Sequence, residues 1–305
     1  MKISHILTED TFTKRGDIGL VIDDGILLDA GAAIVGLRMP DSVEEIDDRV
    51  FFEHTQLQTV QFSKNLKTIG DGAFYKCNHL QEVILPEGCL SIGRDAFREC
   101  WQLNKVQLPN TLVKIGQEAF RDCPKLPSIV IPDSVTTIEM SAFEKCSRLE
   151  RVTLGHGLSK LPCWCFQDCK SLKEIDIPEN IVTIDGSCFL SCSNLTSITL
   201  HPGLKTIGGG AFSSCSKLEK LKLPETVELI DFGAFMYLTM TEITLPHSIQ
   251  ALGGRLFSGA KISTIYYKGT VKDWKNISKD RAWASEAVRN LKVVCTDEVL
   301  IYNKG

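Results

Sequence analysis

The chain contains 305 residues with a net charge of −4 and 43% hydrophobic residues, which is the balance of an ordinary soluble protein. This charge gives no reason to expect a nucleic-acid partner, because binding the phosphate backbone requires clustered Lys and Arg. No run of about 18 apolar residues is present, so we expect no membrane insertion.

Residues 1–36 precede a repetitive region and are predicted to cap it. The stretch LVIDDGILLDA has two apolar runs around Asp24-Gly25, which is a strong β-hairpin signal. The opening segment MKISHILTEDTFTKRGDIGL has no apolar core of about 7–15 residues and no small-residue cleavage site, which are the marks of a secretory signal. We therefore expect a cytoplasmic protein.

Residues 37–268 form the repetitive region, in which a phenylalanine returns every 23 residues. The shared columns read L-x-x-V/I-x-L/I-P-x-x-x-L/V-x-x-I-G-x-x-A-F-x-x-C. A fixed period of this length is the signature of a stacked solenoid, here of about ten repeats. The recurring phenylalanines are Phe51, Phe74, Phe97, Phe120, Phe143, Phe166, Phe189, Phe212 and Phe235, and Phe257 follows one residue early.

Each repeat has the pattern of an α/β unit. The V-x-L alternation predicts a strand with one buried face, and this strand must end at the proline, which lacks a backbone donor. The x-x-I segment is also expected to be extended, and G-x-x-A-F-x-x-C predicts a short helix that begins at the Gly or Asp column. Strands stack about 4.8 Å apart and helices are about 10 Å wide. We therefore expect a concave parallel β-sheet with the helices on the convex side.

Residues 269–305 depart from the repeat and are predicted to form a C-terminal cap. Near-helical spacing of apolar residues predicts a short amphipathic helix over 279–291, and Val293-Val294 and Val299–Tyr302 resemble closing strands. Aromatic residues concentrate in the segment after Phe257, which leads into this cap, and their burial there is favoured over a sugar-binding role. They are Tyr266, Tyr267, Trp274 and Trp283.

The unit LPxxLxxIGxxAFxxCxxLxxIxL resembles the BspA-like class of leucine-rich repeats, found in bacteria and some protozoan parasites. The resemblance covers roughly residues 37–268, and DDGILLDAGAAIVGLRMP and TIYYKGTVKDWKNI are similar to the flanking segments of that family. It implies a leucine-rich-repeat solenoid that acts in protein–protein contact, host-protein binding or adhesion. Many members are exported, so the resemblance leaves a cell-surface or secreted location open, with a host or matrix protein as the partner.

Seven cysteines share one column of the repeat, in which His54, Leu238 and Ala260 also occur. A column that tolerates Leu and Ala is a packing column, so we expect free thiols rather than disulfides or metal ligands. These cysteines are Cys77, Cys100, Cys123, Cys146, Cys169, Cys192 and Cys215. Cys163 with Cys165 and Cys169 lacks the second pair that a zinc site requires.

No catalytic constellation stands out. The six histidines are scattered, and a general base requires a partner within hydrogen-bond reach. His156 and Cys163 are predicted on opposite sides of one coil, which is poor geometry for a dyad. We therefore expect no enzymatic activity, no metal and no cofactor.

The candidate binding surface is the outward face of the predicted sheet, where mixed charges accompany two apolar side chains. Glu82–Lys105, Arg151–Glu174 and Lys220–Glu242 are predicted neighbours of opposite sign. The face is also compatible with an ordinary solvated surface. The first functional hypothesis is that this face binds a partner protein, and the second is that the protein is an adhesin that contacts host matrix. The third is carbohydrate binding by the aromatic C-terminal cap. The candidate residues are Glu82, Ile84, Lys105, Gln107, Val130, Arg151, Thr153, Glu174, Asp176, Thr199, Lys220, Lys222, Glu242 and Thr244.

Overall fold

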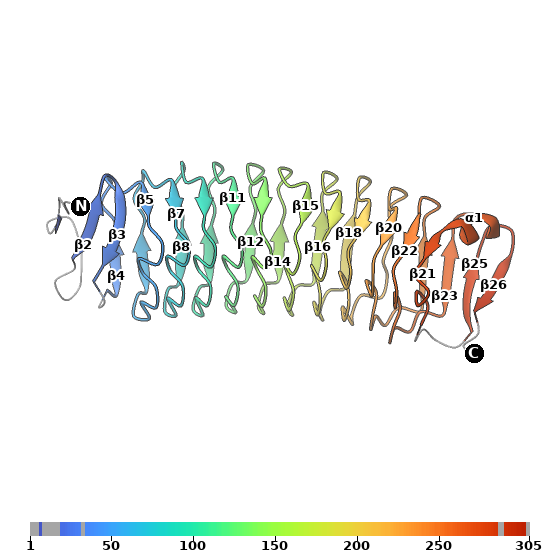
Figure 1. Ribbon diagram of the computed structural model, residues 1–305. Coiled ribbons are helices and arrows are strands. Elements are labelled where there is room, and N and C mark those ends of the chain that lie inside the picture. The colour runs from blue at the N-terminus through green and yellow to red at the C-terminus, as the bar shows by residue number, and fades with distance from the viewer. Residues whose placement is uncertain (1–5, 8–18, 32–33, 286–289, 303–305) are drawn as a thin grey trace. The chain divides into compact units, whose positions relative to one another are not determined.

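The computed structural model describes residues 6–7, 19–31, 34–285 and 290–302. The chain divides into two compact units, Met1–Gly157 and Leu158–Gly305, and each is described by itself. In both units the chain winds in coils that stack on one another (Figure 1). A typical coil contributes one longer strand, one two-residue strand and a run of turns.

In the first unit, the two-residue strands extend an N-terminal antiparallel hairpin into one sheet with the order β1-β2-β3-β5-β7-β9-β11-β13. The strands of this sheet are β1 (Ile6–Leu7), β2 (Leu20–Asp23), β3 (Ile26–Ala30), β5 (Glu45–Ile46), β7 (Thr68–Ile69), β9 (Ser91–Ile92), β11 (Lys114–Ile115) and β13 (Thr137–Ile138). The longer strands pair in parallel as β4-β6, β8-β10 and β12-β14. They are β4 (Gly36–Arg38), β6 (Thr59–Gln61), β8 (Glu82–Ile84), β10 (Lys105–Gln107), β12 (Ser128–Val130) and β14 (Arg151–Thr153).

In the second unit, the two-residue strands form a six-stranded parallel sheet. They are β15 (Lys160–Leu161), β17 (Thr183–Ile184), β19 (Thr206–Ile207), β20 (Leu229–Ile230), β22 (Ala251–Leu252) and β24 (Ser278–Lys279). The longer strands form the pair β16-β18 and the four-stranded sheet β21-β23-β25-β26. They are β16 (Glu174–Ile177), β18 (Ser197–Leu200), β21 (Glu242–Leu245), β23 (Thr264–Tyr267), β25 (Leu291–Val294) and β26 (Val299–Tyr302).

The N-terminal hairpin turns at Asp24-Gly25, where both residues have positive φ angles, 47° and 79°. Two consecutive left-handed residues define the type I′ turn that matches the twist of a hairpin. β2 and β3 are antiparallel, and β3 then pairs in parallel with β5. The hairpin therefore covers the edge of β5, the first two-residue strand of the stacked coils.

The recurring phenylalanines form the centre of both cores, as the period predicts. In the first unit, Phe51 stacks on Phe74 with ring centroids 4.8 Å apart, and the stack continues to Phe143 at separations of 5.1, 5.3 and 5.5 Å. In the second unit, the stack runs from Phe166 to Phe257 at 5.6, 5.6, 6.3 and 6.0 Å. All these rings are fully buried.

The prediction of short helices beside the phenylalanines is wrong, because these segments are turns whose backbone bonds to the next coil. The N–H groups of Asp95, Phe97 and Glu99 donate to carbonyls one repeat further on, at 2.8, 2.8 and 2.9 Å. Asp95 and Glu99 have left-handed φ angles of 54° and 59°, which no α-helix accepts. Donors that alternate between the next coil and the local turn leave none for the i→i−4 bonds of a helix.

Two inferences rested on these helices: the capping role of the Gly column and the argument for a concave sheet. The Gly column does not cap a helix; Gly93 instead lies so close to the preceding coil that a Cβ there would be 2.6 Å from the carbonyl carbon of Gly70. Neither glycine has a positive φ, as the sequence indicated. The argument for a concave sheet used the greater width of helices, which these turns do not have. The concave placement therefore stays a prediction.

The C-terminal helix also lies elsewhere than predicted. α1 spans Val271–Asn276 and is capped by Thr270, whose hydroxyl accepts from the N–H of Asp273 at 3.2 Å. Of the range predicted to be helical, 279–291, residues 281–285 are turns, 290 is a turn residue and 291 begins β25, while 286–289 lie outside the described residues. The helix follows the capping box Thr270–Asp273, a stronger start signal than the spacing of apolar residues.

Candidate functional site

The outward side chains of the longer strands form a surface that we call the long-strand face. Successive side chains of a strand point to opposite sides, and the inward ones, such as Val83 and Ile175, are buried. Every candidate residue that the sequence placed on this face is exposed. In the first unit these are Glu82, Ile84, Lys105, Gln107, Val130, Arg151 and Thr153. In the second unit they are Glu174, Asp176, Thr199, Lys220, Lys222, Glu242 and Thr244.

In the first unit, one predicted ion pair of the long-strand face is present. The register places Lys105 beside Glu82, and Lys105 Nζ lies 3.1 Å from Glu82 Oε2. Both side chains are about half exposed, so the pair contributes at most about 1 kcal/mol to stability. The predicted pair of Arg151 and Glu174 has one residue in each of the two units and stays a prediction.

Two apolar side chains stand out from this polar part of the long-strand face. Ile84 is 44% exposed and Val130 is 60% exposed, and Gln107 on β10 is beside Ile84 in the register. Isolated exposed apolar residues are common on protein surfaces. Here each occurs on a short strand that pairs in parallel with one neighbour, β8 with β10 and β12 with β14, which restricts its position.

In the second unit, the long-strand face is polar from β16 to β21. Glu174 and Asp176 on β16 lie beside Ser197 and Thr199 on β18, and Asp176 Oδ1 is 2.8 Å from Nε2 of His201. Further along, an isolated parallel bridge joins Lys222 to Thr244, and the predicted neighbours Lys220 and Glu242 each lie two residues before these partners. This part of the face offers charges of both signs and hydroxyl groups.

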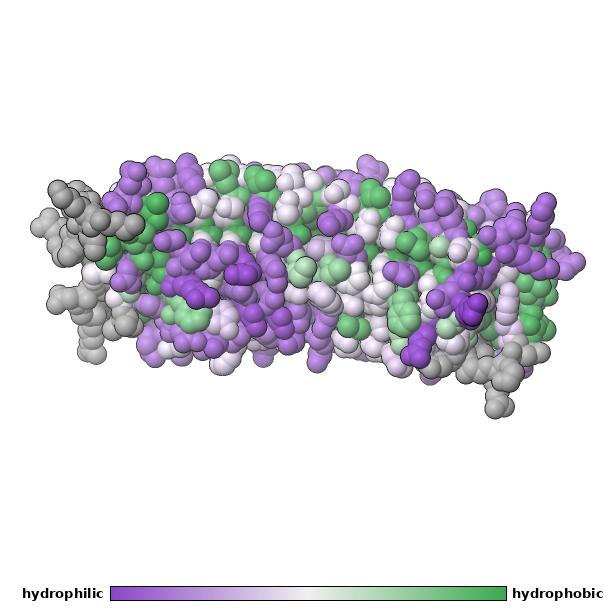
Figure 2. Space-filling model, in the orientation of Figure 1, coloured by the Kyte–Doolittle hydropathy of each residue, from purple (hydrophilic) through white to green (hydrophobic). Residues whose placement is uncertain are grey.

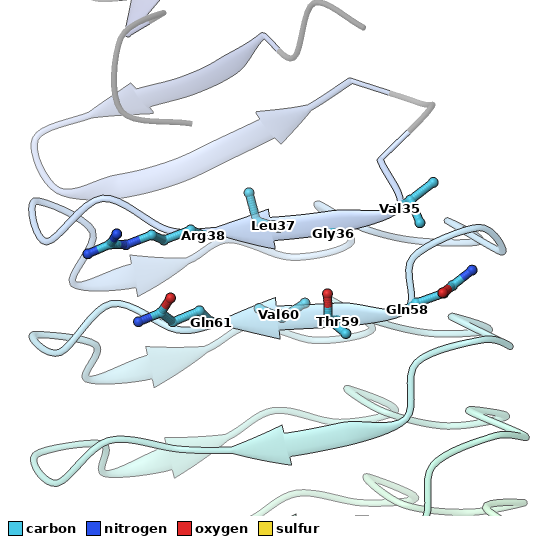
Figure 3. Close-up of a pocket in the computed structure, with 8 residues that line it drawn as sticks. All are labelled: Val35, Gly36, Leu37, Arg38, Gln58, Thr59, Val60 and Gln61. Atoms are coloured by element: carbon cyan, nitrogen blue, oxygen red, sulfur yellow. The ribbon is translucent and has the colours of Figure 1, made fainter. Parts of the chain in front are cut away.

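The long-strand face has a hollow of about 690 Å³ over β4 and β6 (Figure 3). Arg38 and Gln61 lie side by side at its carboxyl end, and Val35 and Gln58 lie at its other end. The hollow occurs where Gly36 occupies an outward position, which carries a side chain in the following strands. The sequence analysis missed this hollow, although the repeat register extended one unit back from Thr59 reaches Gly36.

The turns of the first unit carry a second surface that the sequence analysis did not single out. Phe52 stacks on Tyr75 at 4.9 Å, and the Arg98 guanidinium lies 5.6 Å from the Tyr75 ring centre. Arg98 pairs with Glu118 at 2.7 Å, and Arg121 pairs with the same carboxylate at 2.9 Å. Phe52, Tyr75, Arg98 and Arg121 occupy one column of the repeat, the position directly after each recurring phenylalanine. The sequence therefore already indicated that these side chains lie in a row. Their charges are neutralised within the unit, which leaves less for a ligand.

The cysteine ladder is buried, as predicted, and all twelve cysteines are free. Burial raises the pKa of the Cys77 and Cys146 thiols to about 12. Within each unit, ladder thiols donate to the carbonyl of a phenylalanine in the preceding coil; Cys123 Sγ, for example, is 3.2 Å from the oxygen of Phe97. The other thiols that make this bond are Cys77, Cys100, Cys146, Cys192 and Cys215. The thiolate, which is the nucleophilic form, is therefore disfavoured in the ladder.

The histidines and the remaining cysteines were tested for catalytic or metal-binding geometry. His156 belongs to the first unit and pairs with Asp133, Nδ1 to Oδ1 at 3.2 Å, with both side chains largely exposed. Cys163 belongs to the second unit and is half-buried, whereas Cys165 and Cys169 are buried. Within the described residues, no group of three or more His, Cys, Asp or Glu side chains could hold a metal ion. Among the same residues, no helix is both long and apolar enough to cross a membrane.

The aromatic residues of the C-terminal segment are mostly interior. Trp274 is fully buried and its Nε1 donates to the hydroxyl of Tyr302 at 2.8 Å. Tyr267 and Trp283 are 3% and 8% exposed, whereas Tyr266 is 42% exposed. A sugar-binding platform requires accessible ring faces, and only Tyr266 among the four predicted residues offers one.

Figure 2 shows hydrophobic side chains as separate small patches among hydrophilic and intermediate ones on the visible face. On this face the hydrophobic side chains therefore do not merge into one large apolar area.

The solved structures that resemble this chain are bacterial leucine-rich repeat proteins. A leucine-rich repeat protein from Bacteroides ovatus is 26% identical with a TM-score of 0.70, and the match covers 85% of this chain and 71% of that protein. The pneumococcal vaccine antigen PcpA is 24% identical with a TM-score of 0.58, over 78% of this chain and 63% of that protein. A search of curated protein sequences finds no significant match.

The repeat itself matches a family model. The model of the BspA-type leucine-rich repeat region, which contains six copies, matches residues 30–150, 113–239 and 205–278. Together with the stacked coils, the phenylalanine stack and the cysteine ladder, this match identifies the fold as a leucine-rich-repeat β-solenoid built almost entirely of strands and turns. The chain belongs to the BspA-type leucine-rich repeat family.

Proposed function

We propose that this protein binds a partner protein, without catalysis, through the long-strand face. The observation that carries this proposal is the pair of exposed apolar side chains, Ile84 at 44% and Val130 at 60%, on a rigid array of paired strands. Apolar anchors surrounded by polar groups are the usual anatomy of a protein-binding patch. The backbone around them is fixed by inter-coil hydrogen bonds, so binding would cost little ordering entropy.

Within the first unit, the proposed centre of contact is formed by Ile84, Gln107 and Val130. Lys105 and Glu82 form a polar border beside it, and Arg151 and Thr153 on β14 continue that border. The turn surface around Arg98 is the weaker candidate, because its guanidinium groups already bind the carboxylates of the same unit. Charges that are paired internally must lose those partners before they contact a ligand.

In the second unit, the polar part of the long-strand face is proposed to provide specificity. The outward residues there are Glu174, Asp176, Thr199, Lys220, Lys222, Glu242 and Thr244. Charged groups of both signs favour one orientation of a partner and disfavour partners of mismatched charge. We also propose that residues 1–36 and 269–305 act as caps, which shield the terminal coils and do not themselves bind this partner.

The proposal is tested by photo-cross-linking from the centre of the face. A cross-linking amino acid at Gln107 is exposed to extracts of the source organism's cells and, separately, of its medium. A matched probe at Lys114 lies on the exposed face of a two-residue strand. We expect a protein adduct from Gln107 that is absent from Lys114, and the extract that yields it also gives the location of the partner.

The specificity of the adduct is tested by charge substitution. Ile84→Glu with Val130→Glu should weaken binding of the captured partner at least tenfold, as loss of apolar anchors does. The matched control, Leu90→Glu with Val113→Glu, changes apolar residues that are 45% and 42% exposed and lie immediately before the two-residue strands β9 and β11. It should leave affinity unchanged. Equal loss in both variants, or loss in neither, would reject the long-strand face as the binding surface.

A further inference from the structure

The last strand of the second unit, β26, is an open sheet edge without the usual protection. It ends the four-stranded sheet β21-β23-β25-β26, and within the described residues only its β25 side is paired. Natural edge strands are commonly blocked by charged residues, Pro or bulges. The sequence of β26 is VLIY, which contains none of these. Trp274 Nε1 donates to Tyr302 at 2.8 Å and anchors the strand to the core.

The outward face of this sheet also changes character toward β26. On β21 the outward residues are polar, whereas the register brings Tyr266 beside Val294 and Val294 beside Val299. Val299 and Ile301 are 55% and 58% exposed. An apolar patch that adjoins an unpaired strand edge is a typical site of strand addition.

The hydrogen-bond pattern of the hairpin shows which backbone groups point to the open edge. Cys295 N–H donates to the carbonyl of Glu298 at 2.9 Å, and antiparallel pairs alternate between bonded and non-bonded. The next pair, Val294 with Val299, is therefore non-bonded, and Lys292 with Ile301 is also non-bonded. The N–H and C=O groups of Val299 and Ile301 thus point away from β25, toward the open edge.

We propose that this edge docks a second copy of the chain, with the two β26 strands antiparallel about a two-fold axis at Leu300. In this register Val299 of one copy exchanges two backbone hydrogen bonds with Ile301 of the other, and the reciprocal pair does the same. The exposed side chains then meet as β-branched apolar neighbours. The nearest outward charge, Lys292, is separated from its own copy by both strands, so no like charges oppose one another.

The contact is small compared with the standard interface of about 1,600 Å². A dissociation constant on the order of 100 µM is therefore expected. Sedimentation equilibrium of the full chain between roughly 5 and 500 µM, which brackets this constant, should show reversible dimers.

Two variants test the strand pairing. Val299→Pro removes one open-edge N–H and no bond to β25, so it should stay folded and weaken the dimer at least tenfold. Ile301→Lys places a charge in the contact and should have the same effect. Val130→Lys, in the first unit, makes the same change at an equally exposed apolar residue and should leave dimerisation intact.

The register is tested by disulfide trapping. Bonded antiparallel partners have Cα atoms about 5.5 Å apart, within the range of a disulfide. A mixture of Val299→Cys chains with Ile301→Cys chains should therefore form cross-linked dimers faster than either variant alone. A monomer over the whole concentration range, a dimer that Val299→Pro does not weaken, or equal cross-linking in the mixture and in the single variants would each overturn the proposal.

Discussion

Replacing Phe97 by Ala tests whether the stacked phenylalanines hold the coils together. Phe97 is fully buried, and its ring centre lies 5.1 Å from that of Phe74 and 5.3 Å from that of Phe120. Both contacts are nearly parallel, with interplanar angles of 8° and 11°. The substitution therefore removes one ring, breaks two ring contacts and leaves a cavity between neighbouring coils.

The magnitude follows from these losses. Truncation of a buried Phe to Ala costs about 3–5 kcal/mol, and each aromatic pair is worth about 0.5–1.5 kcal/mol beyond the buried area. With two pairs lost in a stack that has little room to collapse, we expect the upper half of that range, about 4–5 kcal/mol. Phe97→Leu retains most of the volume and should cost clearly less.

The assay is urea unfolding followed by circular dichroism, with hydrogen exchange to locate the effect. Gln107→Ala, at an exposed position one repeat on, is the control and should change stability by less than about 0.5 kcal/mol. Exchange should accelerate most in the coils that contain Phe74, Phe97 and Phe120, because repeats contact mainly their neighbours. A loss below about 1 kcal/mol at Phe97, equal to that at Gln107, would refute the stacked-core account.

Two further predictions concern the thiols and the turns. Burial raises the pKa of Cys77, Cys146 and Cys215 from 9.0 to about 12, so between these pH values the unfolded chain loses thiol protons that the folded chain keeps. The free energy of unfolding should therefore be unaffected by these thiols below pH 9 and should fall as pH rises toward 12, by up to about 1.4 kcal/mol per pH unit and thiol. Urea midpoints measured against pH should show this fall, and Cys146→Ala should make it shallower. Ser214 has a left-handed φ of 62°, a region in which glycine carries no Cβ penalty, so Ser214→Gly should stabilise the protein by about 0.5 kcal/mol. Ser197→Gly, on the extended strand β18, should destabilise it by a similar amount. A thermal melt in which both variants shift the midpoint in the same direction would contradict this account.

Most of the core residues could be predicted from the sequence, because the same positions of the 23-residue repeat are buried from one coil to the next. The phenylalanine and cysteine columns and the V-x-L alternation each depend on which side chains face inward, and a strict repeat gives every coil the same answer. The exposed candidates on the long-strand face, such as Ile84 and Val130, followed from the same alternation. The Thr270–Asp273 capping box is also visible in the sequence, but the sequence analysis placed the helix by the apolar spacing over 279–291 instead.

The turn conformation could not be read in the same way, because its cause lies in a neighbouring coil. Left-handed φ angles occur at Asp95, Glu99, Trp164 and Tyr237, none of which is the glycine that marks such positions locally. A segment with Ala and Phe at helical spacing satisfies the local criteria for a helix. Only hydrogen bonds to residues one repeat away make the strained turn more favourable.

The sequence by itself determined that this protein is a stack of similar coils, since a fixed period leaves the aromatic and thiol columns no other way to be buried together. The tertiary structure decided what each coil is made of, because the partners of the backbone donors belong to adjacent coils. It also decided which strand stands at the edge of the last sheet of the described residues. The apolar outer edge of β26 results from the position of the last hairpin in its sheet, and no local pattern of residues specifies that position.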